Sequence, residues 1–382
     1  MANNNDNKVL NVPPLRFPEF SGEWKMCTIG ELITKVGSGV TPRGGEAVYK
    51  TEGHPFVRSQ NVGLGNLLLD DIAFIDEETH LRQKNTELQF NDVLLNITGA
   101  SIGRSALVDK QIVGGNVNQH VCIIRTKENL VPSFICSFLL SNYGQRQIDS
   151  FQAGGNRQGL NFEQIKSIKI TIPSKDEQIK IAKLLRAIDE RIATQNKIIE
   201  KLQSLIKGIA QNVARNNKPN IRLSECLECS SSTLQESDVC ENGTYPVYGA
   251  NGIVGYIDNY NTEKEAVYII KDGSGVGTVS YVTGKCSATG TLNTLQAKEG
   301  YSLQYLYYML KVFNFEPYKT GMAIPHIYFK DYGKAKIFCT SYTEQLKYVG
   351  LLSAIDNKLS AEQSILTDLS LQKQYLLRQM FI

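Results

Sequence analysis

The sequence predicts an α+β fold with a pseudo-two-fold internal repeat, in which two long helices separate two globular domains and pair as an antiparallel coiled coil. Three observations predict it: a duplicated segment, two stretches of heptads, and a region of short apolar runs before each stretch. We expect an N-terminal arm and first domain in residues 1–173, and a central helix and linker in 174–217. A second domain in 218–340 and a C-terminal helix in 341–382 complete the chain.

The duplicated segment is EQIKIAKLLRAID at residues 177–189, which returns as EQLKYVGLLSAID at residues 344–356. The displacement is 344 − 177 = 167 positions, and the same displacement maps Gly154 onto Gly321 and Phe162 onto Phe329. A repeat unit of this length is far longer than a solenoid repeat of about 20–50 residues. The chain is therefore predicted to be a tandem duplication of a whole domain and its helix.

Apolar residues recur at heptad spacing from Ser174 to about Val213 and again from Ser341 to Met380. Alternating intervals of four and three residues over about five heptads are typical of a long helix in a coiled coil. Ser174 and Glu177 have the spacing of a capping box at the start of the first helix. The predicted coiled-coil positions are Ile181, Leu185, Ile188, Ile192, Gln195, Ile199, Leu202, Leu352, Ile355, Leu359, Glu362, Leu366 and Leu369.

The apolar stripe of each helix needs a partner, and the other helix is the obvious one. Gln195 and Glu362 occupy equivalent core positions near the middle of the two helices. In an antiparallel pair they would form one buried polar layer that fixes the register, so they favour that polarity. The alternative is that each polar residue faces a partner protein or solvent.

Both globular regions read as strands and turns around one shorter helix. The first begins with a proline-rich segment, Pro13–Trp24, that we expect to lie as an extended arm against its domain. The helix of the first region is predicted at Pro132–Ile148, and its counterpart at Ser302–Phe313. Strands are predicted at Pro55–Val57, Leu67–Leu69, Val93–Ile97, Val121–Ile124 and Ser167–Pro173, with glycine-broken hairpins at Tyr245–Ile257 and Lys271–Val282.

Composition bounds the function only loosely. The 382 residues, 42% hydrophobic and 21% charged, suit a soluble protein of several domains, with no apolar run that could span a bilayer. A net charge of +3 neither indicates nor excludes nucleic acid. The polar N-terminus does not resemble a secretory signal, so we expect a cytoplasmic protein whose eight cysteines are reduced. Cys226 and Cys229 lack a second ligand pair at zinc spacing, and no metal site is predicted.

Four stretches of the sequence are distinctive: LRFPEF followed by EWKMCTIGEL, GGNRQGLNFEQIKSIKITIPSKDEQIKIAKLL, GMAIPHIYFKDYGKAKIFCTSYTEQLKYVGLL and YPVYGANGIVGYI. In these stretches and their order, the chain resembles the specificity subunit of type I restriction–modification systems. The resemblance implies two target-recognition domains, each reading one half of a bipartite site in double-stranded DNA. It also implies that the family's two conserved helices set the spacer and dock two modification subunits, which methylate adenine with S-adenosylmethionine, and that restriction (translocase and nuclease) subunits join them.

One part of the second domain departs from the first. KPNIRLSECLECSS matches EWKMCTIGELITKVGSG only weakly, and the second domain is shorter. We therefore expect the two domains to read unlike sequences.

Candidate DNA-contacting residues lie in glycine-rich polar loops that recur in both halves. Arginine, lysine, asparagine and glutamine can reach base edges, and glycine allows the backbone to approach phosphates. Such loops also suit carbohydrate or protein ligands, and the resemblance is what selects DNA. The candidates are Arg58, Gln60, Asn61, Ser101, Arg104, Asn118, Gln119, His120, Asn156, Arg157 and Gln158 in the first half, and Tyr248, Asn251, Lys271, Ser274, Thr291, Asn293 and His326 in the second.

No catalytic set is evident. The Asn11–Leu15 string has the wrong order for the base-holding loop of an amino-methyltransferase, and the DGSGVG run at 272–277 reads as a hairpin turn. We therefore expect a non-catalytic chain that binds no cofactor itself, with S-adenosylmethionine held by the modification subunit. The alternatives are a self-sufficient methyltransferase or restriction enzyme with fused recognition domains, and a scaffold that binds only proteins through its heptads.

Overall fold

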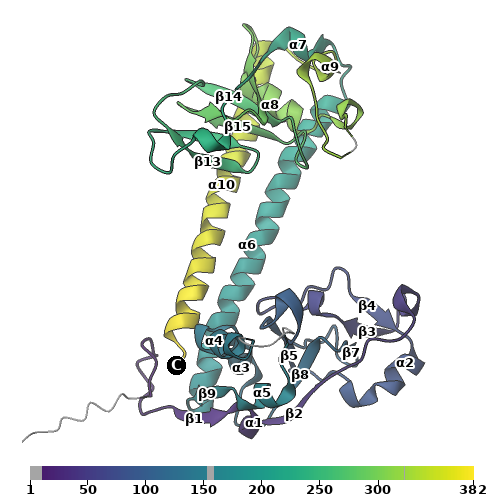
Figure 1. The fold of residues 1–382 in the computed structure, drawn as a ribbon, viewed down its shortest axis with the longest axis vertical. Helices are drawn as coiled ribbons and strands as arrows, with labels where there is room; N and C mark the ends of the chain where they lie inside the picture. Colours follow the sequence, from purple (N-terminus) through teal and green to yellow (C-terminus); the bar gives the residue numbers. More distant parts are fainter. Residues whose placement is uncertain (1–10, 153–158, 322) are drawn as a thin grey trace, which may run out of the picture. The chain divides into compact units, whose positions relative to one another are not determined.

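The computed structural model describes residues 11–152, 159–321 and 323–382, and its contacts divide the chain into two units (Figure 1). The first unit comprises residues 1–195 and 365–382, and the second comprises residues 196–364. Each unit is α+β, as predicted. Two long helices, α6 (Lys175–Arg215) and α10 (Tyr342–Gln379), run through both units and fall within two residues of their expected bounds.

In its described residues, the domain of the first unit contains three sheets, ordered β1-β9, β2-β8-β5-β6 and β4-β3-β7. All their pairs are antiparallel except β3 with β7. The strands are β1 (Lys25–Thr28), β2 (Ile33–Ser38), β3 (His54–Val57), β4 (Ala73–Ile75), β5 (Val93–Asn96), β6 (Ser105–Leu107), β7 (Asn116–Val117), β8 (Val121–Thr126) and β9 (Lys169–Ile172). The helices are α1 (Ile29–Leu32), α2 (Glu77–Arg82), α3 (Pro132–Leu140), α4 (Asn142–Ser150) and α5 (Phe162–Ser167).

The second domain repeats this topology strand for strand, as β10-β18, β11-β17-β14-β15 and β13-β12-β16. Even the one parallel pair returns, as β12 with β16. The strands are β10 (Ile221–Arg222), β11 (Leu227–Ser231), β12 (Tyr245–Gly249), β13 (Gly252–Ile257), β14 (Glu265–Ile270), β15 (Val279–Thr283), β16 (Ser287–Ala288), β17 (Leu292–Ala297) and β18 (Lys336–Ile337). The helices are α7 (Leu223–Cys226), α8 (Leu303–Lys311) and α9 (Phe329–Tyr332).

Strand register locates where the second domain is shorter. Phe56 of β3 pairs with Asn116, and Val247 of β12 pairs with Ser287 in the same way. Val247 therefore corresponds to Phe56, with a displacement of 247 − 56 = 191. In the central sheet, Asn96 of β5 corresponds to Ile270 of β14, a displacement of 270 − 96 = 174. The difference, 191 − 174 = 17 residues, falls between β3 and β5, where the first domain carries α2. The seven described residues between β13 and β14 contain no helix.

The single helix predicted at Pro132–Ile148 is two helices, α3 and α4. The chain breaks at Ser141, whose hydroxyl donates to the carbonyl of Phe138 at 2.7 Å and accepts from the amide of Gly144 at 3.3 Å, starting α4. A Cβ on Gly144 would lie 2.3 Å from the oxygen of Phe138, so only glycine permits this tight corner. The predicted strand Leu67–Leu69 is also wrong: Asn61 binds Leu68 through both its backbone and its side chain, closing a turn there.

The identical glutamines of the duplicated segment have the same role in both units. Gln178 is buried and its side-chain oxygen accepts from the amide of Val131 at 2.9 Å, just before α3. Gln345 is equally buried and accepts from the amide of Ser302 at 2.9 Å, just before α8. Each glutamine therefore fixes the start of a long helix to the helix of its own domain.

The predicted capping box at the start of α6 is only half formed. The hydroxyl of Ser174 accepts from the amide of Glu177 at 3.3 Å, as expected. The carboxylate of Glu177 instead accepts two hydrogen bonds from Arg16 in the N-terminal arm, at 2.7 and 2.8 Å. These bonds raise the pKa of Arg16 and hold the arm against the start of α6. A charged, bidentate donor outcompetes the neutral backbone amide.

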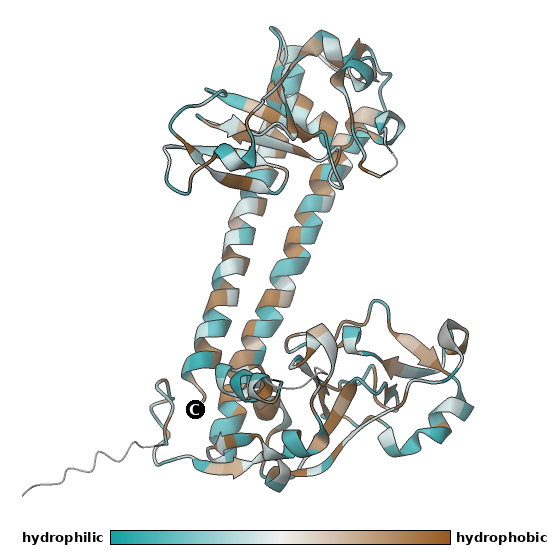
Figure 2. Ribbon diagram, in the orientation of Figure 1, coloured by the Kyte–Doolittle hydropathy of each residue, from teal (hydrophilic) through white to brown (hydrophobic). Residues whose placement is uncertain are grey.

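The heptad positions of both helices are buried or half-buried, as predicted. In the first unit, Ile181 and Leu185 of α6 share a core with Leu376 and Met380 at the end of α10. In the second, Ile206 and Val213 near the end of α6 share a core with Leu352 near the start of α10. The start of each helix thus packs with the end of the other, which makes the pairing antiparallel. Figure 2 shows apolar residues recurring along both helices between hydrophilic ones.

Gln195 and Glu362 are both buried, at 8% and 6% exposed, as core positions should be. Because they belong to different units, their pairing stays a prediction. Among residues 11–152, 159–321 and 323–382, no helix combines the length and apolar character needed to cross a membrane.

Candidate nucleic-acid interface

The predicted loops meet at one edge of the central sheet in each domain. In the first, the turn after β5 and the loop before β8 are joined where Ile97 donates to the carbonyl of His120 at 3.0 Å. In the second, Lys271 donates to the carbonyl of Thr291 at 3.0 Å in the same place. Since Asn96 pairs with Val121 and Ile270 with Leu292, strand register alone brings these loops together.

The segments that precede α5 and α9 meet the same edge at Gly159 and His326. Thr98 forms an antiparallel bridge with Gly159, and Asp272 forms the corresponding bridge with His326. The predicted residues Asn156, Arg157 and Gln158 lie outside the described part of the chain. Gly159 and His326 are related by the 167-residue displacement of the repeat (326 − 159 = 167), so the two bridges are equivalent.

The turn after β5 has the same shape as the turn after β14. Gly99 and Gly103 have φ of 72° and 85°, and Gly273 and Gly277 have φ of 92° and 89°. Residues with a Cβ rarely adopt this left-handed conformation, which explains the glycines. The run at 272–277 therefore connects two hairpin strands, as predicted. The turn leaves Arg104 exposed, with no side-chain partner among the residues that the structure describes.

The loop after β3 is tied to the same edge. Asn118 donates to the carbonyl of Val57 at 3.1 Å, and Thr289 donates to the carbonyl of Tyr248 at 2.8 Å. Arg58 is half-buried: it donates to the carbonyl of Asp71 at 2.8 Å and lies over the ring of Tyr49. The described residues of these loops in each domain therefore form one continuous surface, defined here as the loop edge.

The candidate residues divide by exposure. Three are buried and make internal hydrogen bonds: Asn61 with Leu68 and Asp71, Asn118 with the amide of His120, and Asn293 with Ser231 and Tyr332. In this conformation these three shape the loops and do not reach a ligand. Gln60, Arg104, Gln119, Asn251 and Ser274 are exposed, and Arg58, Ser101, His120, Tyr248, Lys271, Thr291 and His326 are half-buried.

A fifth loop belongs to this edge and was not among the predicted ones. The segment after β2 reaches Gln119, whose side-chain oxygen accepts from the amide of Thr41 at 3.0 Å. In the second domain the segment after β11 takes this place, and the carbonyl of Leu234 accepts from the amide of Gly290 at 2.8 Å. Residues 37–45 (GSGVTPRGG) combine glycine with Arg43, the same signal that identified the other loops.

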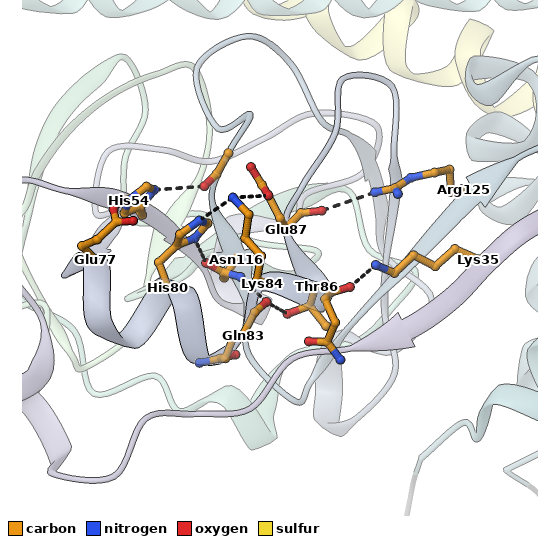
Figure 3. Close-up of polar contacts among 12 residues, drawn as sticks. Lys35, His54, Glu77, His80, Gln83, Lys84, Thr86, Glu87, Asn116 and Arg125 are labelled. Carbon is orange, nitrogen blue, oxygen red and sulfur yellow. Dashed lines mark hydrogen bonds and ion pairs between the residues drawn. The ribbon is translucent and has the colours of Figure 1, made fainter.

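A polar network holds α2 against the loop edge of the first domain (Figure 3). His80 is buried, its Nδ1 lies 2.7 Å from Oδ1 of Asn116, and Asn116 donates to the carbonyl of Gln83 at 3.0 Å. The ring of His54 stacks on that of His80 at 3.8 Å, and its Nε2 lies 2.6 Å from the carboxylate of Glu77. That hydrogen bond lowers the pKa of Glu77.

The loop edge offers side-chain donors, acceptors and cations to a ligand. In the described residues, no three His, Cys, Asp or Glu side chains are grouped to hold a metal ion. Different side chains stand at equivalent places: Arg104 against Thr278, Gln119 against Gly290, and His120 against Thr291. One scaffold thus presents two different chemical surfaces.

Known proteins match this architecture. Residues 21–204 and 219–370 each match the family model described as the type I restriction modification DNA specificity domain. A Mycoplasma genitalium protein named as a type I specificity subunit is 26% identical over 320 residues, covering 76% of this chain and 81% of that protein. The EcoKI specificity subunit of Escherichia coli is 22% identical over 202 residues, covering 50% of this chain and 41% of that protein.

Solved structures show the same fold. The crystal structure of the type I restriction–modification S subunit from M. genitalium aligns with a TM-score of 0.65 at 19% identity, covering 97% of this chain and 99% of that one. A chain from a structural study of type I system assembly aligns with a TM-score of 0.54 at 16% identity, covering 93% and 96%. The chain belongs to the type I restriction–modification DNA specificity family, and each of its halves contains one copy of the family's domain.

Proposed function

We propose that this chain is the non-catalytic subunit that selects DNA sequence for a type I restriction–modification complex, with each domain reading one half of a bipartite site. The observation that carries the proposal is the loop edge, which is built by the same hydrogen bonds in both domains yet presents different side chains. A shared scaffold with different donors and acceptors suits two unlike half-sites. Exposed Arg104 has the chemistry that reads guanine.

We also propose that the two long helices set the spacer between the half-sites. Helix α6 has 41 residues, which at about 1.5 Å each gives a rod of roughly 60 Å. Its heptads pair with those of α10, so inserting seven residues into both helices keeps the apolar stripes in register. In a complex with its partners, we expect that variant to methylate sites with a changed spacer, measured by mapping methylated adenines genome-wide. An unchanged spacer would contradict the proposal.

The partners proposed are double-stranded DNA, two modification subunits and restriction subunits. The internal repeat supports two copies of one partner, because it gives each unit the same domain and the same paired helix ends. Native mass spectrometry of the complex should find two modification subunits per chain, and one copy would contradict the stoichiometry. S-adenosylmethionine is proposed to bind the modification subunit. Eight free cysteines support a reducing, cytoplasmic setting.

Two other functions are separable by simple assays. If the purified chain alone transfers methyl groups from S-adenosylmethionine to DNA, it is a self-sufficient enzyme and the proposal fails. If the chain with its modification subunits shows no salt-sensitive DNA affinity in a filter-binding assay, it is a protein scaffold instead. Salt sensitivity is the expected result because contacts to phosphates release counterions.

A further inference from the structure

We propose that the first domain carries a second DNA contact beside its loop edge, a basic hollow that takes the phosphate backbone of the duplex flanking the first half-site. The proposal rests on the DNA-reading function above and adds a site to it. The hollow, of about 520 Å³, lies between the loop that joins β2 to β3 and helix α2. Arg43 and Lys50 from that loop line it, and Arg82 and Asp76 line its α2 side.

The position of the loop is fixed at both of its sides. The amide of Thr41 donates to Gln119 of the loop edge at 3.0 Å, and the amide of Val40 donates to Gln83 at the end of α2 at 3.0 Å. Gly39 passes directly over β7, where a Cβ would lie only 1.7 Å from the carbonyl oxygen of Val117. The hollow is therefore continuous with the loop edge, and a duplex lying on Gln119 would extend over it.

The charges of the hollow suit a polyanion. Arg43 and Lys50 are exposed, and neither forms an ion pair with a side chain that the structure describes. Arg82 is paired with Glu78 at 2.5 Å, and Asp76 accepts from the amide of Thr79 at 2.9 Å as the cap of α2. Lys50 also acts through its charge on Asp76, whose pKa is lowered first by hydrogen bonds from Thr79 and then by Lys50. With Arg82 paired to Glu78, the two cations Arg43 and Lys50 outnumber the one carboxylate of Asp76, so the lining keeps a net positive charge for phosphate oxygens. Val40, 64% exposed at the rim, offers an apolar surface to a sugar ring.

The hollow is a property of the first domain. Its α2 wall lies between β4 and β5, and the corresponding described residues 258–264 between β13 and β14 contain no helix. The wall itself is held by the network of His80, Asn116 and Gln83 in Figure 3. We therefore expect the two domains to hold their half-sites unequally, with more backbone contacts outside the first.

The test measures the salt dependence of cognate-DNA affinity for the complex with modification subunits. Each lost phosphate contact should lower the slope of log K against log[salt] by about 0.9. Arg43→Ala with Lys50→Ala should therefore lower it by about 1.8, without changing which adenines are methylated. Arg43→Lys with native Lys50 keeps both charges and should retain the native slope. Lys25→Ala with Lys110→Ala removes two exposed charges elsewhere in the same domain and should leave the slope unchanged.

An unchanged slope in the Arg43/Lys50 variant, or an equal fall in the Lys25/Lys110 control, would overturn the proposal. A variant that binds DNA normally but fails to assemble with modification subunits would also overturn it, since the hollow would then contact protein. Failure of the DNA-reading function is distinguishable, because the native complex would itself show no salt-sensitive affinity for cognate DNA. Hydroxyl-radical footprinting should show protection retracting outside the first half-site only.

Discussion

Asp272 lies 2.5 Å from Nδ1 of His326, across the bridge that joins the turn after β14 to the segment before α9. Thr98 occupies the place of Asp272 in the first domain and lies 2.5 Å from Nδ1 of His120. The two histidines come from different loops, since His120 precedes β8. Each domain therefore has an imidazole beside the equivalent residue of its turn, Thr98 or Asp272, although the imidazole comes from a different loop in each.

The Asp272–His326 pair should act as one unit in DNA recognition. With Nδ1 held by the carboxylate, the ring is oriented and Nε2 is left for a base or phosphate. We expect His326→Ala to weaken cognate binding by about 1–3 kcal/mol. Asp272→Asn should weaken it less, because the amide oxygen can still accept. The double variant should lose no more than His326→Ala alone, and full additivity in filter binding would show that the residues act separately.

Arg104 should contribute directly to DNA binding. Its side chain is exposed where the glycine turn ends, directly before β6, and the second domain has Thr278 there. We expect Arg104→Ala to reduce methylation of cognate sites; a relaxed sequence pattern would indicate a base contact, and a lower salt slope a phosphate contact. Lys110→Ala, an exposed lysine three residues beyond the end of β6, is the control. Normal site-selective methylation by the Arg104 variant would remove this residue from the interface.

Neighbouring leucines of α10 should differ sharply in their effect on stability. Leu352 is fully buried in the second unit's core, whereas Leu351 is 52% exposed. Leu352→Ala should lower the free energy of unfolding by about 2–5 kcal/mol, because it leaves a cavity. Leu351→Ala should change it by less than about 0.5 kcal/mol. The comparison needs the urea midpoints of both variants, and equal shifts would contradict the burial of the heptad stripe.

Thiol reactivity should be dominated by Cys240. Cys240 is exposed, whereas burial raises the pKa of Cys122 and Cys226 to about 12 and that of Cys136, Cys229 and Cys339 to about 11. Burial also raises the pKa of Cys27 and Cys286. The thiolate is the reactive form, so near pH 8 these seven groups stay protonated. A disulfide reagent should modify one thiol rapidly in the native chain and none in Cys240→Ser. Rapid modification of several would show that the cores open readily.

The helical part of this protein could be predicted from the sequence because helical and heptad periods are local patterns. The predicted coiled-coil positions from Ile181 to Leu369 are all buried or half-buried. The antiparallel sense inferred from Gln195 and Glu362 is the one observed within each unit. The local capping prediction was weaker. It could not foresee that Arg16, 161 residues away, would take the carboxylate of Glu177.

The loop edge could be predicted less well, because composition does not show which side chains are exposed. Composition picked out Asn61 and Gln60 alike, but Asn61 is buried inside its own turn whereas Gln60 is exposed. It also missed the Arg43 loop, which joins the edge only through Gln119.

The sequence by itself determined the duplication, the two rods and the family, because each is carried by residues close together along the chain. Only the tertiary structure decided that the duplication extends to the start of both domains, where Cys27 pairs with Ile170 in β1–β9 while Ile221 pairs with Ile337 in β10–β18. Insertions between strands change the displacement of the repeat and hide it from sequence comparison. Hydrogen-bond register between distant strands preserves it, and the same register gathers separate loops into one surface.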